Sequence, residues 1–286
     1  MCLDLSREWR FRDDRKNHTL NALRLTPGMT VLDAGCGPGS LTRKLAIWLG
    51  TSSLIIGVDQ DTAFIEYAQE QAKQSAIENI EFIEGDVLAL PLENNYVDAS
   101  TSYTVIEHVP NYEFLKEQKR VCRSGGIVSV IMAKPKNSIR SNPDTIPPVI
   151  DREIELWAPI EKLQKTLCSD GMVGKYNPEP HELPIIFDEL GFTNIQVDAL
   201  VLPVSIDDYR NSNEQKRAIL ESDRIEQIEN IDRILALFPN TLPEKQVSEL
   251  KRLIDKRYSE RLALLMKGIA VWDYTINIAL IVSGIA

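Results

Sequence analysis

The stretch VLDAGCGPGS, residues 31–40, decides how the rest of the chain is interpreted. An apolar run ends in Asp33, and Gly35, Gly37 and Gly39 follow at every second position. Glycines let the backbone adopt positive φ and approach a ligand closely. The G-x-G-x-G spacing differs from the G-x-G-x-x-G of dinucleotide loops, and a carboxylate at position 33 repels a pyrophosphate. The loop therefore predicts a ligand that is cationic or zwitterionic in its middle, such as an ammonium or a sulfonium.

Short apolar or β-branched runs alternate with helix-like stretches around this loop. The runs cover residues 31–34, 54–59, 80–84, 96–103 and 127–133, and the helix-like stretches cover 40–49, 61–76 and 111–123. Such alternation is typical of right-handed crossovers between parallel strands. Ser40 and Asp61 are expected to cap the first two helices, because their side-chain oxygens can accept from free backbone N–H groups. The pattern predicts a doubly wound α/β fold.

The second half of the chain departs from this alternation. Residues 134–148 are rich in Pro, Asn and Ser and predict a loop, whereas 206–269 carry apolar residues at helical spacing. Helices are also expected around 152–168 and 181–191, and further strands at 195–203 and 274–283. A strand, a long helical insertion and a last strand indicate that the last two strands pair, one of them antiparallel.

The composition limits the classes of protein. The 286 residues have a net charge of −10, with 43 % hydrophobic and 26 % charged residues, which is typical of a globular chain that is not held on nucleic acid by a basic surface. Four scattered cysteines without a CxxC pair favour reduced thiols in the cytoplasm over zinc or disulfides. The N-terminus lacks an apolar signal core, and the most apolar stretch, 276–286, is too short to span a bilayer.

Two further strand ends carry carboxylates suited to the rest of such a ligand. Asp59 follows the second strand, where a carboxylate can accept hydrogen bonds from both hydroxyls of a ribose. Asp86 follows the third strand, beside the backbone N–H of Val87, and such a pair can bind the edge of an adenine. Ribose, adenine and a positively charged centre together describe S-adenosylmethionine.

Five segments now stand in a recognisable order. They are VLDAGCGPGS, GVDQD (57–61), GDVLALPLENNYVD (85–98), TVIEHVPN (104–111) and SGGIVSVIMAKP (124–135). In this order and spacing the chain resembles the class I S-adenosylmethionine-dependent methyltransferases, most nearly the group with the quinone-biosynthesis and related small-molecule enzymes. The resemblance implies a Rossmann-like, mostly parallel seven-stranded sheet with the last strand antiparallel. It also implies S-adenosylmethionine as methyl donor, S-adenosylhomocysteine as product, and transfer to an O, N or C centre of a small molecule.

The resemblance also assigns cofactor-binding residues, position by position. The loop is expected to hold the methionine part, Asp59 the ribose, and the third-strand loop the adenine; Tyr103, at the end of the fourth strand, is expected beneath the cofactor near the methyl group. The full set of expected cofactor-binding residues is Asp33, Ala34, Gly35, Gly37, Gly39, Asp59, Gln60, Asp86, Val87 and Tyr103.

The adjacent pair Glu107 and His108 has two interpretations. It either caps the loop after the fourth strand or supplies a general base for a hydroxyl or thiol acceptor. Some related enzymes bind a divalent metal here through E-x-x-E-H, but Thr104 stands where the first Glu of that motif belongs. No metal is therefore predicted.

Three parts of the chain follow from this interpretation. Residues 1–24 are expected to form a helical segment that closes over the cofactor. Residues 25–204 and 270–286 are expected to form the methyltransferase domain. The insertion 205–269 is suited to a substrate lid or to a homodimer contact. A cofactor-binding regulatory or scaffolding protein without transferase activity stays open as the alternative, whereas the loop spacing disfavours an NAD-linked oxidoreductase.

Overall fold

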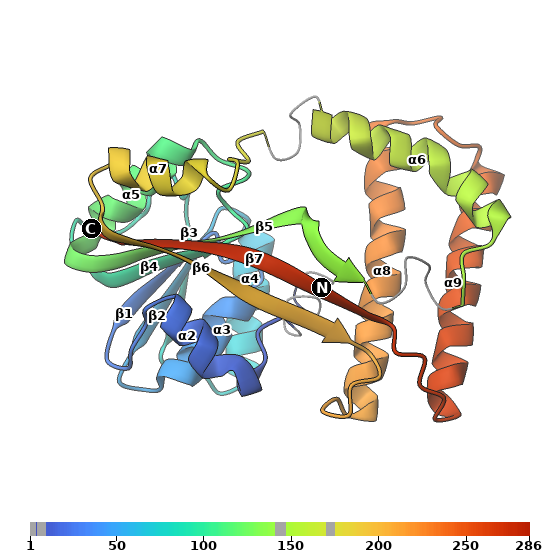
Figure 1. Ribbon diagram of the computed structural model, residues 1–286, viewed down its shortest axis with the longest axis horizontal. Coiled ribbons are helices and arrows are strands. Elements are labelled where there is room, and N and C mark those ends of the chain that lie inside the picture. Colours follow the sequence, from blue (N-terminus) through green and yellow to red (C-terminus); the bar gives the residue numbers. More distant parts are fainter. Residues whose placement is uncertain (1–3, 5–9, 141–146, 170–174) are drawn as a thin grey trace.

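Seven strands form one sheet in the order β3-β2-β1-β4-β5-β7-β6 (Figure 1). The structure is a computed structural model and describes residues 4, 10–140, 147–169 and 175–286. The strands are β1 Thr30–Ala34, β2 Leu54–Asp59, β3 Ile80–Glu84, β4 Val97–Tyr103, β5 Cys122–Arg140, β6 Thr193–Ser205 and β7 Tyr274–Ile285.

All strand pairs from β3 to β5 are parallel, and β7 runs antiparallel to both of its neighbours, β5 and β6. This is the predicted fold class, which is confirmed, including the antiparallel last strand. The parallel strands end at one edge of the sheet, with Asp33 in register with Gly57 of β2 and Thr101 of β4.

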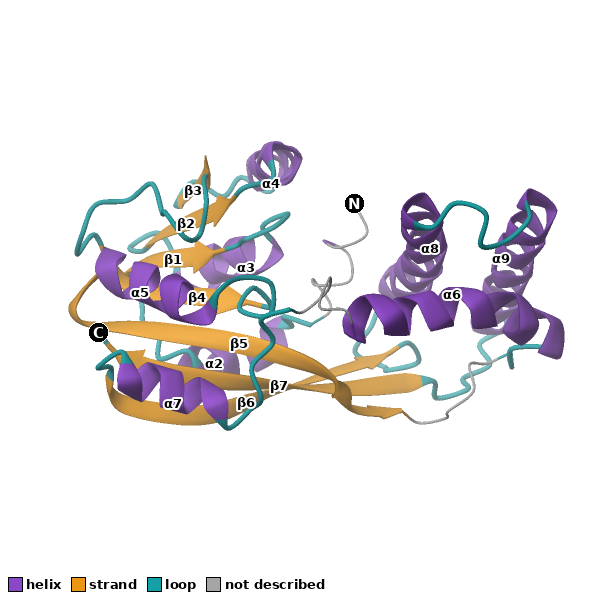
Figure 2. Ribbon diagram, turned by 90° about the horizontal axis from the view of Figure 1, so that it is seen from above, coloured by secondary structure: helices purple, strands orange, loops and turns teal. Residues whose placement is uncertain are grey.

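Helices cover both faces of the sheet (Figure 2). One face carries η1 Asp13–Arg15, α2 Lys16–Ala22, α3 Ser40–Leu49 and α4 Thr62–Gln74, and the other carries α5 Asn111–Val121 and α7 Glu182–Glu189. Leu41, Leu45 and Leu49, spaced by four residues, place one buried side of α3 on the sheet. Phe114 and Phe187 fill the opposite layer. Each such side chain contributes roughly 1.5–3 kcal/mol by leaving water.

Three long helices form a separate layer beyond the sheet. They are α6 Asp151–Ser169, α8 Asn213–Leu237 and α9 Glu244–Met266, and they stand at the far end of the extended β5, β6 and β7 (Figure 1). Ile160, Ile231 and Ile254, one from each helix, are fully buried together in their common core. We call these three helices the helical unit. α6 therefore packs with the insertion, although the 43 residues 170–212 separate it from α8 in the sequence.

Two buried ion pairs hold the helical unit together. Arg257 of α9 donates to Glu153 of α6 at 2.9 Å, and both side chains are less than a tenth exposed. Arg261 donates at 2.9 Å to Asp207, which follows β6 and also accepts from the backbone N–H of Trp272. Breaking a buried pair of this kind costs about 3–5 kcal/mol because one charge is left without its partner.

The expected loop at 134–148 is wrong for its first part, because β5 continues to Arg140. Residues 141–146 of this expected loop lie outside the described chain. Ser138, Ile139 and Arg140 pair with Asn277, Ile276 and Thr275 of β7. Backbone hydrogen bonds to β7 stabilise this extension. Because β7 lies nearly 140 residues further along the chain, the local composition of 134–148 does not predict this pairing.

One of the two expected helix caps is confirmed. Asp61 accepts hydrogen bonds from the N–H groups of Ala63 and Phe64 and caps α4. The cap at Ser40 is wrong, because Gly39 occupies the cap position of α3 with φ +79°. Ser40 is the first helical residue instead, and its hydroxyl donates to Asp4 at 2.5 Å.

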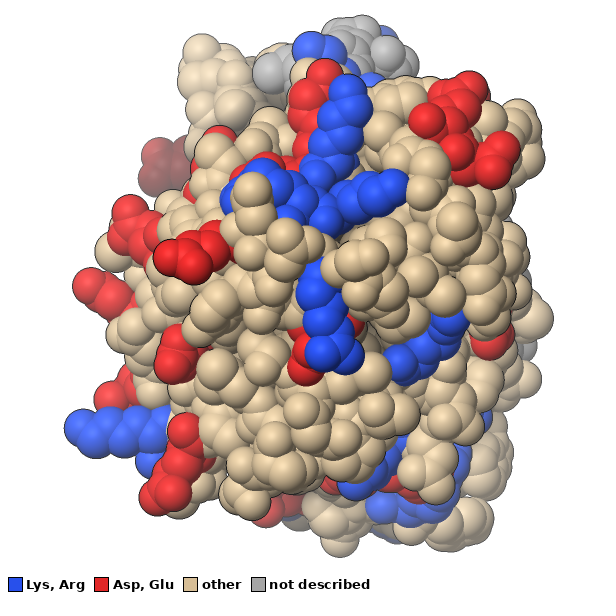
Figure 3. Space-filling view, turned by 90° about the vertical axis from the view of Figure 1, so that its left-hand side faces the viewer, with Lys and Arg blue, Asp and Glu red and all other residues tan. Residues whose placement is uncertain are grey.

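The surface away from the helical unit carries charges of both signs. Figure 3 shows Lys and Arg side chains interspersed with Asp and Glu over this end of the molecule. Within the part of the chain that the structure describes, no helix is both long and apolar enough to cross a membrane.

Candidate active site

A cavity of about 320 Å³ opens at the carboxyl edge of the sheet, at the ends of β1, β2 and β4. In open α/β sheets this edge is where ligands bind. Its lining brings together seven of the twelve residues expected from the sequence: Gly35, Gly37, Asp59, Gln60, Asp86, Val87 and His108.

The glycine loop forms one wall of the cavity. The N–H groups of Gly35 and Cys36 donate to the carbonyl of Val58, at 2.8 and 3.0 Å, which holds the loop against β2. Gly35 and Gly37 have φ of +75° and +52°. A Cβ on Gly35 would lie 2.5 Å from Cγ2 of Val105. Position 35 therefore requires glycine, both for its positive φ and for the close approach of the segment that follows β4.

Asp59 links the second strand to this loop. Its Oδ2 accepts from the N–H of Gly37 at 2.7 Å, and its Oδ1 accepts from the N–H of Asp61 at 3.1 Å. An ionised carboxylate offers about four lone-pair sites, so both oxygens can still accept from a ligand hydroxyl. Asp59 is thus fixed in orientation by two backbone groups while it lines the cavity.

Asp86 is also held by its own turn. Its Oδ1 accepts from the N–H of Leu88 at 2.8 Å, and Asp86 forms an isolated bridge with Ala89. Val87 presents an apolar wall beside it. This combination places a carboxylate next to an apolar surface, which suits the edge and face of a planar base.

Five expected residues lie behind the cavity wall: Asp33, Ala34, Gly39, Tyr103 and Glu107. Asp33 is 1 % exposed and accepts from the hydroxyl of Thr42 at 2.7 Å, so it joins the end of β1 to α3 beneath the loop. A Cβ on Gly39 would lie 2.8 Å from the ring of Phe82. The structure therefore places these two residues in support of the loop.

Tyr103 connects the end of β4 to the N-terminal segment. Its hydroxyl accepts from Nη1 of Arg10 at 2.9 Å. Its ring meets the ring of Phe11 edge-on, with centroids 5.1 Å apart. Of the expected closing segment 1–24, residues 1–3 and 5–9 lie outside the described chain.

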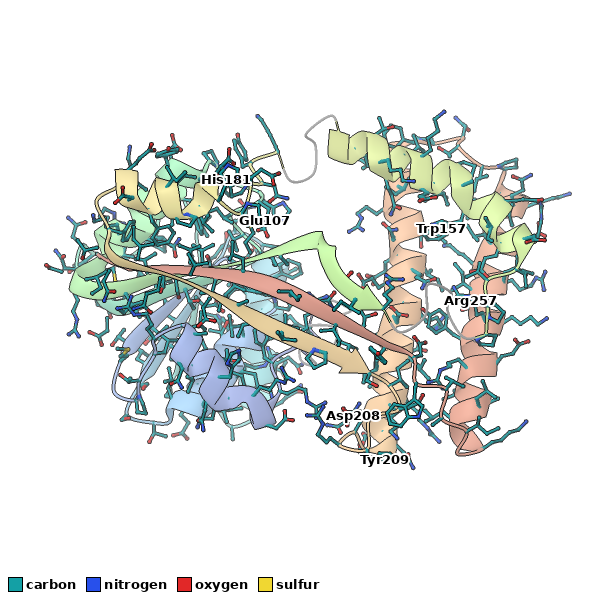
Figure 4. All side chains as sticks on the ribbon, in the orientation of Figure 1. Glu107, Trp157, His181, Asp208, Tyr209 and Arg257 are labelled. Atoms are coloured by element: carbon teal, nitrogen blue, oxygen red, sulfur yellow. The ribbon has the colours of Figure 1, made fainter. Side chains whose placement is uncertain are left out.

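Glu107 and His108 are neighbours in sequence but take different positions. His108 is exposed and lines the cavity. Glu107 is 5 % exposed, and its Oε1 accepts from the N–H of Ala133 at 3.2 Å, which ties this loop to β5 (Figure 4). Of these two neighbours, His108 alone lines the cavity. Across the described ranges, no group of three or more His, Cys, Asp or Glu side chains is arranged to hold a metal ion.

Four lining residues were not expected from the sequence: Phe64, Thr104, Val105 and Val109. Phe64 lies in the first turn of α4, three residues after the capping Asp61. Its place just after the end of β2 could have identified it from the sequence as a residue near the cavity. Thr104 has φ +54°, a backbone conformation that is uncommon outside glycine. No local sequence pattern predicts this conformation at a threonine.

The sheet order and the cavity at its carboxyl edge define a Rossmann-like α/β fold of the class I S-adenosylmethionine-dependent methyltransferases. Residues 25–175 match the methyltransferase-domain family. The chain belongs to this family, which confirms the resemblance drawn from the five segments.

Individual relatives share part of the chain. A demethylmenaquinone methyltransferase from Lactococcus lactis is 37 % identical over 105 residues, which are 36 % of this chain and 42 % of that enzyme. The matched segments span only 34–52 % of the length of the first curated relatives.

Solved structures share the fold over nearly the whole chain. Haemonchus contortus phosphoethanolamine N-methyltransferase 2, in complex with S-adenosyl-L-methionine, has a TM-score of 0.52 at 16 % identity, covering 96 % of this chain and 52 % of that chain. A structure from Bacillus halodurans that is assigned as a methyltransferase has a TM-score of 0.51 at 14 % identity. The match covers 95 % of this chain and 98 % of that chain. At such identities the likeness shows the fold alone.

Proposed function

We propose that this protein transfers the methyl group of S-adenosylmethionine to an O, N or C centre of a small molecule in the cytoplasm. One observation carries the proposal: a single cavity is lined by the glycine loop, by the carboxylate of Asp59 at the end of β2 and by that of Asp86 after β3. The match to the methyltransferase-domain family over residues 25–175 supports the same activity.

The lining fits this cofactor. Its volume of about 320 Å³ lies within the range of roughly 300–1,000 Å³ that is usual for ligand cavities. Asp59 retains acceptor capacity for the ribose hydroxyls, and Asp86 with Val87 suits the adenine. Gln60 lies beside them on the same wall. The backbone of Gly35 and Gly37 can approach the methionine part, because no Cβ intervenes.

In this proposal Asp33 supplies a negative charge, and the hydrogen bond that it accepts from Thr42 holds its carboxylate in place. It is buried directly below the glycine loop, where a carboxylate is weakly screened and attracts a cation more strongly than in water. The sulfonium of the substrate form is positive and the sulfur of the product form is neutral. The negative charge of Asp33 therefore favours the methyl donor over its product, which helps product release.

The chemistry requires positioning more than activation. When bound, S-adenosylmethionine supplies an electrophilic methyl group, whose carbon bonds to the acceptor atom as the S–C bond breaks. The chain must hold the acceptor in line and exclude water. His108, exposed on the cavity wall, is the residue we propose to accept the proton of a hydroxyl acceptor. Glu107 fixes the loop that carries His108, through its bond to β5.

Calorimetry on the full chain tests the cofactor. We expect S-adenosylmethionine and S-adenosylhomocysteine to bind with micromolar affinity and NAD to bind far more weakly. Absence of binding by well-folded protein refutes the proposal. Methyl transfer from radiolabelled donor is then measured with demethylmenaquinone analogues and phosphoethanolamine, the acceptors that the relatives' names suggest. Cofactor binding without turnover on any acceptor would favour the regulatory or scaffolding alternative.

The helical unit is proposed to cover the acceptor side of the site, because it stands beyond the edge at which the parallel strands end (Figure 2). A homodimer contact through the same helices is the competing role. Light scattering on the purified chain separates the two, since a lid role is compatible with a monomer and a contact role is not.

A further inference from the structure

A second cavity, of about 350 Å³, lies where the extended parts of β5, β6 and β7 meet α8. Charged side chains from four separate parts of the chain line it: Arg10, Arg140, Asp223, Glu226 and Asp273. No residue of this cavity lines the glycine-loop cavity, so the two are distinct sites.

The two cavities adjoin at the end of β4. Arg10 lines the second cavity and donates at 2.9 Å to the hydroxyl of Tyr103, the last residue of β4. The next residue, Thr104, lines the glycine-loop cavity. A molecule in the second cavity therefore lies near Tyr103, the residue expected beneath the cofactor and close to its methyl group.

The charges of the second cavity are mixed, with an excess of carboxylates. Asp223 accepts a hydrogen bond from the hydroxyl of Tyr258, and Arg10 is engaged by Tyr103. The side chains of Glu226, Asp273 and Arg140 form no hydrogen bond with another side chain of the described residues. Burial raises the pKa of the Asp273 carboxyl and of the Glu226 carboxyl, although Arg261 and Arg140 act against it at Asp273 and Arg10 does so at Glu226. A cation that replaces the lost hydration therefore stabilises the charged forms.

We propose that this second cavity is the acceptor subsite and that it takes a small amine carrying an anionic group, with the ammonium at Glu226 and Asp273 and the anionic group at Arg140. This inference rests on the proposed methyltransferase function. In the reaction the ammonium gives one proton to a lining carboxylate. The nitrogen lone pair then bonds to the methyl carbon, the electron pair of the S–C bond stays on sulfur, and the product is a methylated ammonium.

Binding by the full chain tests the subsite with three matched probes. Saturation-transfer NMR is recorded with β-alanine (amine and acid), propylamine (amine alone) and propionate (acid alone), with and without S-adenosylhomocysteine. We expect both amines to bind and propionate to give no signal. The double variant Glu226→Gln with Asp273→Asn should weaken both amines by at least about tenfold, the effect of losing a charge-assisted hydrogen bond. Glu229→Gln, one turn further along α8 and outside the lining, is the matched control.

A single-site variant separates the two ends of the acceptor. Arg140→Gln should weaken β-alanine and leave propylamine unchanged. The inference is overturned if propionate binds as well as the amines, if no probe binds the wild type, or if the double variant and the control behave alike. Calorimetry with S-adenosylhomocysteine on the same samples distinguishes the failures. Loss of that binding counts against the cofactor site, whereas intact binding with no response to the amines counts against the acceptor subsite alone.

Discussion

Replacing Gly35 by alanine is expected to damage the cofactor cavity far more than the same change at a glycine with a similar positive φ. Gly35 has φ +75°, and Gly268, just beyond the end of α9, has φ +70°. A Cβ on Gly35 would lie 2.5 Å from Cγ2 and 3.1 Å from Cγ1 of Val105, whereas a Cβ on Gly268 meets nothing within 4 Å. The two glycines therefore share a positive φ and differ in the space around them.

The magnitudes follow from these two terms. Either alanine costs roughly 1–2 kcal/mol for its positive φ. At position 35 the clash adds roughly 1–3 kcal/mol, because a β-branched neighbour has few alternative rotamers. Val105 lines the cavity, so its displacement also narrows the site. We expect Gly35→Ala to lose roughly 2–5 kcal/mol of stability and at least tenfold in affinity for S-adenosylmethionine, since about 1.4 kcal/mol corresponds to tenfold.

Urea denaturation and calorimetry on the two variants provide the assay. Gly268→Ala should lose only the smaller amount of stability and bind the cofactor like the wild type. Equal losses of stability in the two variants would show that the contact with Val105 contributes nothing. Unchanged cofactor affinity in folded Gly35→Ala would refute the placement of the cofactor against this loop.

Three further changes test other parts of the structure. Asp59→Asn turns an amide N–H toward a backbone N–H, which costs about 1–3 kcal/mol, and should weaken cofactor binding at least tenfold by calorimetry. The control Glu84→Gln, at the end of β3 and outside the cavity, should leave the affinity unchanged. Equal cofactor affinities in the two variants would contradict the role of the Asp59 carboxylate. Asp207→Asn removes the charge that pairs with Arg261, which is 2 % exposed, and should lower the unfolding free energy of the helical unit by about 3–5 kcal/mol in urea, whereas a wild-type curve would show that the pair adds no stability. Burial raises the pKa of Cys122 to about 12, so iodoacetamide at neutral pH should label this thiol only after unfolding, and rapid labelling of native protein, seen by peptide mass spectrometry, would contradict its burial.

Local sequence signals located most of the strands and the loops that follow them. The runs at 54–59 and 80–84 coincide with β2 and β3, since both combine apolar residues with turn-forming ends. The cap at Asp61 was predictable because it depends on a side chain and the next two N–H groups alone. The continuation of β5 to Arg140 was not, since its hydrogen-bond partners come from β7.

The candidate site divides along the same line. The sequence placed Asp59, Asp86 and the glycines at strand ends, and strand ends of a parallel sheet meet at one edge. It could not tell that Glu107 is buried while His108 lines the cavity. That difference depends on the hydrogen bond that Glu107 accepts from the N–H of Ala133 in β5. The buried position of Asp33 likewise depends on Thr42 of a helix packed from one side.

The sequence by itself determined the alternation of strands and helices, the glycine loop and the order of the motifs, because these depend on spacing along the chain. Tertiary structure decided that α6 joins α8 and α9, that Arg10 reaches Tyr103, and that a charged cavity opens beside α8. These features bring together side chains far apart in sequence. Their positions follow from how the layers pack and where β7 pairs, and no local pattern carries that information.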